Sequence, residues 1–236
     1  TKVVVRNLKL YVNREEGFVG TSLRKDEYVA DCSDIDDIIV FTADGKMIIT
    51  KVTEKSYIGK NIVHVGVFKK NDTRTVYNLV YRNGNDKISY IKRFTVTGII
   101  RDKEYDVVEP HKDSQILYFS ANPNGEAEVV TVILRQAGSV KKLKWDINFA
   151  DILIKGRGSR GNIVTKYAIK RIELKEKGVS TLKPRKIWYD PIVHRLNTEG
   201  RGELLGSFKG EDRLLLIGKD AVVKTVTPDL SLHFDP

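Results

Sequence analysis

The chain of 236 residues is 41% hydrophobic and 31% charged, a balance that excludes a disordered protein. It has no apolar run of about 18 residues, which excludes a membrane-spanning helix. Its one cysteine, Cys32, excludes an internal disulfide and favours the reducing cytoplasm. The net charge is +10 and uneven: residues 1–52 contain eight Lys and Arg against nine Asp and Glu, whereas residues 135–186 contain fifteen against four. Such a basic region indicates a polyanionic partner.

Short β-branched runs separated by turn residues follow one another along the chain, and helical periodicity is nearly absent. Tight hairpin turns need residues that tolerate positive φ, and pairs such as Asp44-Gly45 and Asn83-Gly84 meet this need. We therefore expect six hairpins. In chain order, their strands are residues 3–5 and 8–12, 38–42 and 47–50, 76–82 and 88–94, 129–135 and 140–145, 169–174 and 179–182, and 214–217 and 221–226.

The turn glycines recur at intervals of 39, 54, 40 and 40 residues, at Gly45, Gly84, Gly138, Gly178 and Gly218. A period of about 40 is expected for the blades of a propeller. We attribute the one longer interval to an insertion at residues 102–113. Further apolar strands follow glycine-bearing loops at residues 62–68, 163–169 and 204–208. The pattern predicts an all-β, propeller-like array of six blades in one domain, residues 1–236. Because the sequence begins in strand-like residues without an initiator Met, we expect a fragment of a longer protein.

Residues 156–161 have the spacing G-x-G-x-x-G of a dinucleotide-binding loop. The fingerprint requires a helix next, but residues 163–169 are typical of a strand. Asn162 and Ile163 stand where a P-loop requires Lys and then Ser or Thr. We expect instead a flexible basic loop whose arginines contact phosphates. The four histidines lack partners at the spacing of zinc ligands. We therefore predict no cofactor, no metal and no catalytic residue in this chain.

Lysines and arginines recur at or just after the expected hairpin turns and in the loops between hairpins. In a radial array they would form a basic rim that neutralises the phosphates of a double helix with little base readout. Aromatic residues are only 8% of the chain and do not cluster in the basic loops, so stacking on single strands is the weaker interpretation. The residues that we predict to contact duplex DNA are Lys46, Lys51, Lys60, Lys92, Arg93, Lys141, Lys142, Lys144, Lys155, Arg157, Arg160, Lys166, Lys170, Arg171, Lys219 and Lys224.

Three segments resemble the repeated unit of the C-terminal domain of bacterial type IIA topoisomerase A subunits, the gyrase and topoisomerase IV family. They are D-I-I-V-F-T-A-D-G-K at residues 37–46, Y-I-K-R-F at 90–94 and I-K-G-R-G-S-R-G-N at 154–162. With the six repeats, the resemblance covers the whole chain. It implies a six-bladed β-pinwheel, a propeller-like disc of four-stranded blades that exchange strands with their neighbours.

The resemblance also implies what such a disc does. It would bind and bend double-stranded DNA without catalytic chemistry of its own. The active tyrosine and the metal site would belong to the catalytic core of the same polypeptide, and the ATPase to a B subunit. We therefore expect these two partners, a cytoplasmic, nucleoid-associated location, and an ATP-dependent isomerase as the parent protein.

Gyrases of this family carry a basic, glycine-rich box after the first hairpin, which is tied to DNA wrapping and negative supercoiling. The corresponding stretch here is Arg14-Glu15-Glu16-Gly17-Phe18-Val19-Gly20, in which acidic and apolar residues replace most of the basic character. The resemblance therefore favours topoisomerase IV, which unlinks daughter chromosomes and relaxes supercoils, with gyrase as the alternative. The alternative of another class is a propeller-like protein-interaction module whose basic face meets an acidic partner.

Overall fold

The structure, a computed structural model, describes residues 7–138, 140–210, 212–228, 230 and 233–234. These residues form six small sheets and one short 3-10 turn, η1 (Phe149–Asp151), with no α-helix among them. The prediction of an all-β protein built from small sheets is confirmed. We number the sheets 1 to 6 in chain order.

The first three sheets contain four or five strands each. Sheet 1 has the order β3-β1-β2-β6, formed by β3 (Glu27–Cys32), β1 (Leu8–Asn13), β2 (Phe18–Gly20) and β6 (Ser56–Tyr57). Sheet 2 has the order β10-β5-β4-β7, formed by β10 (Glu104–Asp106), β5 (Lys46–Lys51), β4 (Asp37–Thr42) and β7 (Ile62–Phe68). Sheet 3 has the order β11-β8-β9-β14, with β15 also on β9, formed by β11 (Gln115–Asn122), β8 (Val76–Arg82), β9 (Ser89–Thr95), β14 (Ile154–Gly156) and β15 (Asn162–Thr165).

The last three sheets are smaller. Sheet 4 has the order β13-β12-β16, formed by β13 (Lys144–Asn148), β12 (Val129–Leu134) and β16 (Ile169–Glu176). Sheet 5 has the order β18-β17-β19, formed by β18 (Arg195–Asn197), β17 (Arg185–Asp190) and β19 (Glu203–Phe208). Sheet 6 is the hairpin of β20 (Leu214–Ile217) and β21 (Val223–Val226).

Neighbouring sheets exchange strands through the first four repeats. After the hairpin of sheet 2 the chain returns to pair β6 with β2 of sheet 1, and after the hairpin of sheet 3 it returns to pair β10 with β5 of sheet 2. After the hairpin of sheet 4 it returns to pair β14 and β15 with β9 of sheet 3. Each exchanged strand covers an edge that would otherwise be open to another chain.

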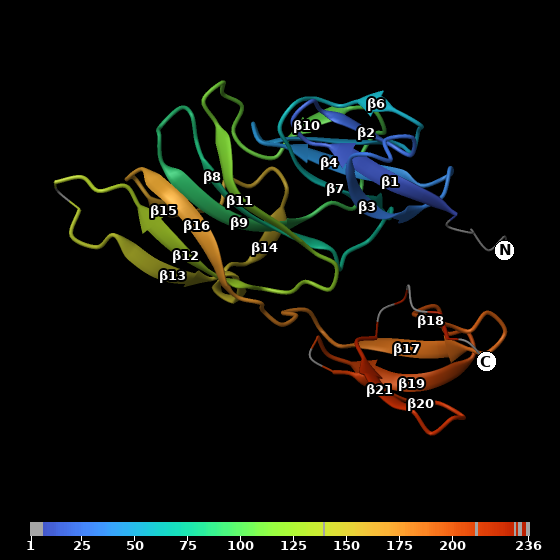
Figure 1. Ribbon diagram of the computed structural model, residues 1–236. Helices are drawn as coiled ribbons and strands as arrows, with labels where there is room; N and C mark the ends of the chain where they lie inside the picture. Colours follow the sequence, from blue (N-terminus) through green and yellow to red (C-terminus); the bar gives the residue numbers. More distant parts are fainter. Residues whose placement is uncertain (1–6, 139, 211, 229, 231–232, 235–236) are drawn as a thin grey trace.

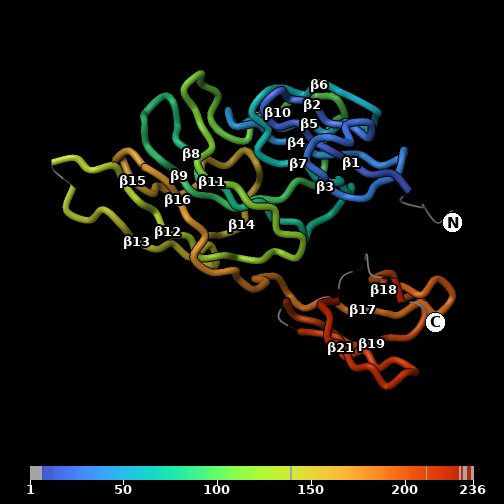
Figure 2. Tube along the Cα trace, in the orientation of Figure 1, coloured from blue at the N-terminus to red at the C-terminus, as the bar shows by residue number. Residues whose placement is uncertain are grey.

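The exchange stops between sheets 4 and 5. The connections that carry exchanged strands span residues 52–61, 96–114 and 149–168, whereas the corresponding connection between β18 and β19 spans only residues 198–202. So short a segment cannot run to another sheet and return. Sheets 5 and 6 accordingly lie apart from the others, joined to β16 by a single segment, as Figure 1 and the Cα trace in Figure 2 show.

The hydrophobic core forms in series between successive sheets. Strand β4 is buried on both faces, because Ile38 and Val40 pack in the cluster shared with sheet 1 while Ile39 and Phe41 pack in the cluster shared with sheet 3. Strands β8 and β9 likewise contribute to the second cluster and to a third that includes sheet 4. A strand covered on both faces has a continuous apolar run in place of alternation, which is the pattern seen in residues 38–41.

Four of the six expected hairpins are present, as β4–β5, β8–β9, β12–β13 and β20–β21. The hairpin expected around Gly178 is wrong, because β16 pairs with β12 and the hairpin of that repeat is β17–β18. Gly178 serves a close approach of two backbones and not a turn, since an ideal Cβ there would lie 1.6 Å from Ala127 O.

Two other expectations about the strands need correction. Residues 3–5, the first strand expected, lie outside the described residues, and residues 8–12 belong to β1, which pairs with β2 and β3. The segment 102–113, expected as an insertion, contains β10 and so supplies the exchanged strand of sheet 2. The long interval between Gly84 and Gly138 thus includes a regular part of the repeat.

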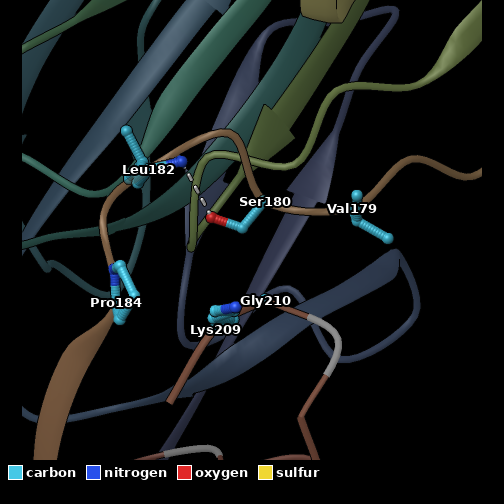
Figure 3. Close-up of a pocket in the computed structure, with 6 residues that line it drawn as sticks. All are labelled: Val179, Ser180, Leu182, Pro184, Lys209 and Gly210. Carbon is cyan, nitrogen blue, oxygen red and sulfur yellow. Dashed lines mark hydrogen bonds between the residues drawn. The ribbon is translucent and has the colours of Figure 1, made fainter. Parts of the chain in front are cut away.

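The segment that leads to sheets 5 and 6 is fixed to sheets 3 and 4 by polar contacts. Ser180 Oγ donates a hydrogen bond to Asn124 O (2.5 Å), and Thr181 N donates to Gly125 O (3.0 Å). A cavity of about 260 Å³ lies beside this segment. Figure 3 shows residues that line it, among them Lys209 and Gly210, which follow β19, and Ser180. The junction therefore has a defined conformation on the side of sheet 4.

Candidate nucleic-acid interface

A concentration of exposed positive charge lies at one end of sheet 4, where the β12–β13 turn meets the connection between β15 and β16. Arg135 N donates a hydrogen bond to Ala168 O (2.9 Å), which holds the two segments together. The groove between them has a volume of about 470 Å³ and is lined by Leu134, Val140, Lys141, Lys142, Trp145, Thr165 and Tyr167. We name the cations that these segments contribute the sheet-4 patch: Arg135, Lys141, Lys142, Lys144, Lys166, Lys170 and Arg171.

Most of the charge of the sheet-4 patch is not paired with carboxylates among the described residues. All seven residues are exposed, and residues 135–145 and 165–171 contain no Asp or Glu. Arg171 pairs with Glu173 (Nε to Oε1, 2.5 Å), whereas the other six side chains have no hydrogen bond or ion pair to any residue that the structure describes. Like charges held close together repel one another, and a polyanion would relieve this repulsion.

The structure brings together only part of the predicted DNA-binding set. Six of the predicted residues lie in the sheet-4 patch, namely Lys141, Lys142, Lys144, Lys166, Lys170 and Arg171. Lys155, Arg157 and Arg160 lie on or beside the exchanged strand β14 at the edge of sheet 3. Lys46 and Lys51 lie on sheet 2, Lys60 in the loop before β7, and Lys219 and Lys224 on sheet 6.

Besides Arg171, two other predicted DNA contacts, Lys46 and Arg160, are engaged in ion pairs within the protein. Lys46 Nζ lies 2.6 Å from Glu104 Oε1 on the exchanged strand β10. Arg160 Nη2 lies 3.1 Å from Asp86 Oδ2 and 2.9 Å from Glu109 Oε2, and its guanidinium stacks over the ring of Tyr90. These carboxylates lower the local positive potential that a phosphate would meet.

The prediction that Lys92 and Arg93 contact DNA is wrong, because their side chains are only 2% and 1% exposed. Both lie on β9, which is covered on both faces, so adjacent residues that point to opposite sides are equally buried. Their position just after a hairpin turn, where lysines are usually exposed, predicts exposed side chains. The structure places them between sheet 3 and the segments packed against it.

These two buried cations are satisfied mainly by uncharged oxygens. Lys92 Nζ donates to Arg157 O (2.6 Å) and Ser159 O (2.8 Å), and burial lowers the pKa of this ammonium from 10.5 to about 8. Burial also lowers the pKa of the Arg93 guanidinium. Arg93 donates to four acceptors on three segments, namely Asn78 Oδ1, Thr181 Oγ1, Gly125 O and Glu126 O.

In the stretch that corresponds to the gyrase box, residues 14–20, Arg14 and Gly17 have structural roles. The stretch forms the β1–β2 turn and β2. Arg14 makes two hydrogen bonds of 2.7 Å to the carboxylate of Glu27, which raise the pKa of Arg14 and lower that of Glu27. Gly17 has a φ of +83°, and an ideal Cβ there would lie 2.3 Å from Gly59 O. The one cation of the stretch, Arg14, is thus paired, and Gly17 is required by the turn.

The glycine-rich loop at residues 156–161 continues into strand β15 and not into a helix, as predicted. Gly161 has a φ of +91°, and an ideal Cβ there would lie 2.4 Å from Ile91 O, so the fold requires glycine at this position. Arg157 donates to Gly98 O (3.3 Å), and its guanidinium lies 4.5 Å from the ring centroid of Tyr105. The loop is therefore fixed to sheet 3 and its neighbours, and the expectation of a flexible segment needs correction.

Sequence reasoning missed Arg135 and the two aromatic residues of the groove. Arg135 directly precedes the β12–β13 turn, whereas the predicted hairpin cations lie in the turns or after them. Trp145 and Tyr167 each follow a lysine of the patch, and this shared Lys-aromatic pair was the available signal. Their proximity depends on the pairing of β12 with both β13 and β16, which sequence spacing does not reveal.

Neither a metal site nor a membrane span is found among the described residues. No group of three or more His, Cys, Asp and Glu side chains in this part of the chain is placed to hold a metal ion. No helix in the same residues is long and apolar enough to cross a membrane.

These observations define a class: a propeller-like protein of hairpin repeats that exchange strands and concentrate positive charge on one sheet. The sequence model of the topoisomerase C-terminal domain of Bacteroidota matches residues 9–177 and 195–236. The chain therefore belongs to the family of bacterial topoisomerase C-terminal domains, the family that the sequence resembles.

Two relatives agree with this assignment. The A subunit of DNA topoisomerase 4 from Borreliella burgdorferi is 29% identical over 175 residues, which are 74% of this chain and 26% of that protein. The chain thus spans about a quarter of the length of this curated relative. A crystal structure of the C-terminal domain of DNA topoisomerase IV has the same fold, with a TM-score of 0.50 and 11% identity over 95% of this chain and 85% of that one. The predicted β-pinwheel fold is confirmed.

Proposed function

We propose that this chain is the C-terminal DNA-binding domain of the A subunit of a topoisomerase IV, in which the sheet-4 patch binds the phosphates of duplex DNA. The observation that carries the proposal is the patch itself, in which seven exposed cations gather on two segments without a carboxylate. Each cation that neutralises a phosphate releases a condensed counterion, which favours binding at low salt.

The proposed binding has low sequence specificity. Contacts of lysines and arginines to phosphates fix the position of a protein on the duplex but do not read its sequence. Further exposed cations lie beyond the patch, at Lys51 and Lys155 on neighbouring sheets and at Lys219 and Lys224 on sheet 6. We expect a duplex that contacts the patch together with cations on the more distant sheets to bend. Bending 20–30 base pairs costs on the order of 1–6 kcal/mol, which several phosphate contacts can offset.

In this proposal the chain contributes DNA capture and no chemistry. Cleavage and metal binding belong to the catalytic core of the same polypeptide, whereas ATP hydrolysis belongs to the B subunit. Topoisomerase IV is favoured over gyrase because the stretch at residues 14–20 offers no free cation: Arg14 is paired with Glu27, and Glu15 and Glu16 are exposed. A negative surface there would repel a duplex that wrapped past the first sheet.

Binding is tested by fluorescence anisotropy with a labelled duplex of random sequence. With six to ten phosphate contacts, the affinity should fall by about 10³–10⁵-fold between 50 and 200 mM salt. A second duplex of unrelated sequence should bind with nearly the same affinity. If neither duplex binds at 50 mM salt, the proposal fails.

Two further measurements address the alternatives. Electrophoretic mobility of circularly permuted duplexes should reveal a bend, whereas ligation of nicked plasmid in the presence of the chain should leave the linking number close to that of free DNA. A large linking-number change would favour gyrase-type wrapping. An acidic polypeptide such as polyglutamate should compete only weakly with duplex, and strong competition would favour the protein-interaction module.

A further inference from the structure

A buried lysine, Lys92, donates hydrogen bonds to the backbone of the basic loop of residues 155–160. Lys92 Nζ donates hydrogen bonds to the carbonyl oxygens of Arg157 (2.6 Å) and Ser159 (2.8 Å), and it lies 5.0 Å from the ring centroid of Phe94. Tyr81 Oη donates to the next carbonyl, that of Arg160 (2.8 Å). Three carbonyls of one short loop are thus bonded to side-chain donors of β8 and β9.

This arrangement changes what the loop offers to solvent. Carbonyl oxygens are the negative ends of the peptide dipoles, and they would repel an approaching phosphate. Because the carbonyls of residues 157, 159 and 160 are turned toward Lys92 and Tyr81, the repulsive groups face the protein. The loop also contributes Lys155, which is exposed and has no partner among the described residues, and the half-buried Arg157.

Two glycines of the loop are not explained by the fold. An ideal Cβ at Gly156 or at Gly158 would meet nothing within 4 Å, and neither residue has the positive φ that favours glycine. Gly161, by contrast, has both a positive φ and a close backbone neighbour. A glycine that the free protein does not require lets a ligand approach the backbone closely.

We propose that Lys92 is a positioning residue for DNA binding, whose buried ammonium holds the loop of residues 155–160 so that the loop contacts a phosphate of the duplex. This inference rests on the proposed function, since it assumes that the chain binds DNA. Strand β15, four residues or about 13 Å long, connects the loop to Lys166 of the sheet-4 patch. One duplex can therefore contact both.

The test compares two single variants with their combination by fluorescence anisotropy at 50 mM salt. Lys92→Met removes the donors while keeping a long apolar stem, and it should weaken DNA binding about tenfold, as for loss of one charge-assisted phosphate contact. Gly158→Ala should leave the melting temperature unchanged, because its Cβ is in open space, yet weaken binding about threefold. The double variant should bind like Lys92→Met alone, because both changes act on one contact.

Several results would overturn the inference. Independent, additive losses in the double variant would show that Lys92 does not act through the loop. Wild-type affinity of Gly158→Ala would show that no phosphate approaches there, and this variant decides the matter even if Lys92→Met does not fold. Hydrogen exchange should show faster exchange of residues 155–161 in Lys92→Met, and unchanged protection there would also contradict the proposal.

A patch variant, Lys142→Glu, is measured in parallel. It distinguishes failure of the role proposed for Lys92 from failure of the proposed function. If this variant loses affinity while Lys92→Met and Gly158→Ala bind like the wild type, only the role of Lys92 fails. If the wild-type chain itself does not bind duplex, the proposed function fails.

Discussion

Sheets 2 and 3 differ from sheet 4 in what surrounds their exposed cations. In sheets 2 and 3, cations at the turns and edges are paired with carboxylates distant in sequence, as in Lys46–Glu104 (2.6 Å), Lys87–Asp113 (2.8 Å), Arg101–Asp37 (3.0 Å) and Arg160–Glu109 (2.9 Å). In sheet 4, the two segments that carry the patch have no carboxylate, and Arg171 alone of its seven cations is paired within the described chain. Both regions contain many lysines and arginines, but only in the sheet-4 patch do several unpaired cations lie together on segments without a carboxylate.

A count of basic residues therefore does not locate a binding surface. An exposed ion pair contributes about 0–1 kcal/mol to stability, so the pairs of sheets 2 and 3 do little for the fold. Their larger effect is electrostatic, because each pair removes a cation from the set available to a phosphate. The DNA-binding surface is expected where pairing is absent.

The largest effect should come from reversing charge in the patch. Replacing Lys141, Lys142 and Lys144 with Glu should reduce affinity for a random duplex about 10³-fold at 50 mM salt, because three phosphate contacts become repulsions. The melting temperature should change little, since all three side chains are exposed. Anisotropy and thermal unfolding measure the two quantities. A loss below tenfold would place the interface elsewhere.

Replacing a buried cation should instead lower stability and leave the salt dependence of DNA binding unchanged. Arg93→Met removes the donor of Asn78 Oδ1 and Thr181 Oγ1 and one of the donors of Gly125 O and Glu126 O, and should lower the free energy of unfolding by about 3 kcal/mol. The salt dependence of DNA binding by the folded variant should be unchanged. Denaturant titration measures the loss, with the exposed Arg171→Met as the matched control, which should cost less than about 0.5 kcal/mol. Equal losses in both variants would contradict this assignment.

The burial of Lys92 should make stability depend on pH. Its pKa is about 8 in the folded chain and 10.5 when exposed, so between these values the unfolded state binds the extra proton and stability rises with pH. By pH 9.5 the gain over pH 7 should reach roughly 2 kcal/mol from this residue. Denaturant titrations of wild type and Lys92→Met at both pH values isolate the effect. If the free energy of unfolding of Lys92→Met rises equally with pH, the pH dependence belongs to other groups.

The smallest effect should come from neutralising the paired cations. Replacing Lys46, Lys87 and Arg101 with Gln removes as many positive charges as a matched change in the patch. The affinity for duplex should nevertheless fall less than about threefold, because partner carboxylates already offset these cations. The same anisotropy assay measures it, and a loss comparable to that of the patch would remove the distinction between the two regions.

Much of the fold could be predicted from the sequence because its signals are local. Turn pairs such as Asp44-Gly45 and Asn83-Gly84 do close hairpins, and the excess of charge in residues 135–186 pointed to the region that holds sheet 4. The hairpin predicted at Gly178 is wrong because a glycine needed for a close backbone approach cannot be distinguished from a turn glycine by its local sequence. The family resemblance, and not the spacing of residues, implied the strand exchange.

The parts of the site that could not be predicted depend on contacts between distant residues. Glu104 is 58 residues from Lys46, so no local pattern shows that this lysine is neutralised. Lys92 and Arg93 were expected to be exposed because two cations alone do not distinguish a strand buried on both faces from a strand with one polar face. Arg135 joins the patch only through the pairing of β12 with β16.

Binding of phosphates by the sheet-4 patch is tested most directly by the slope of log K for duplex binding against log salt concentration. The slope is measured for the wild type and for a variant with Lys141, Lys142 and Lys144 changed to Gln. If these lysines each neutralise one phosphate, the variant should lose about 0.9 of the slope for each of them, or roughly 2.7 in all. An unchanged slope would mean that the three lysines do not contact the phosphates, and the role given to the sheet-4 patch would be wrong.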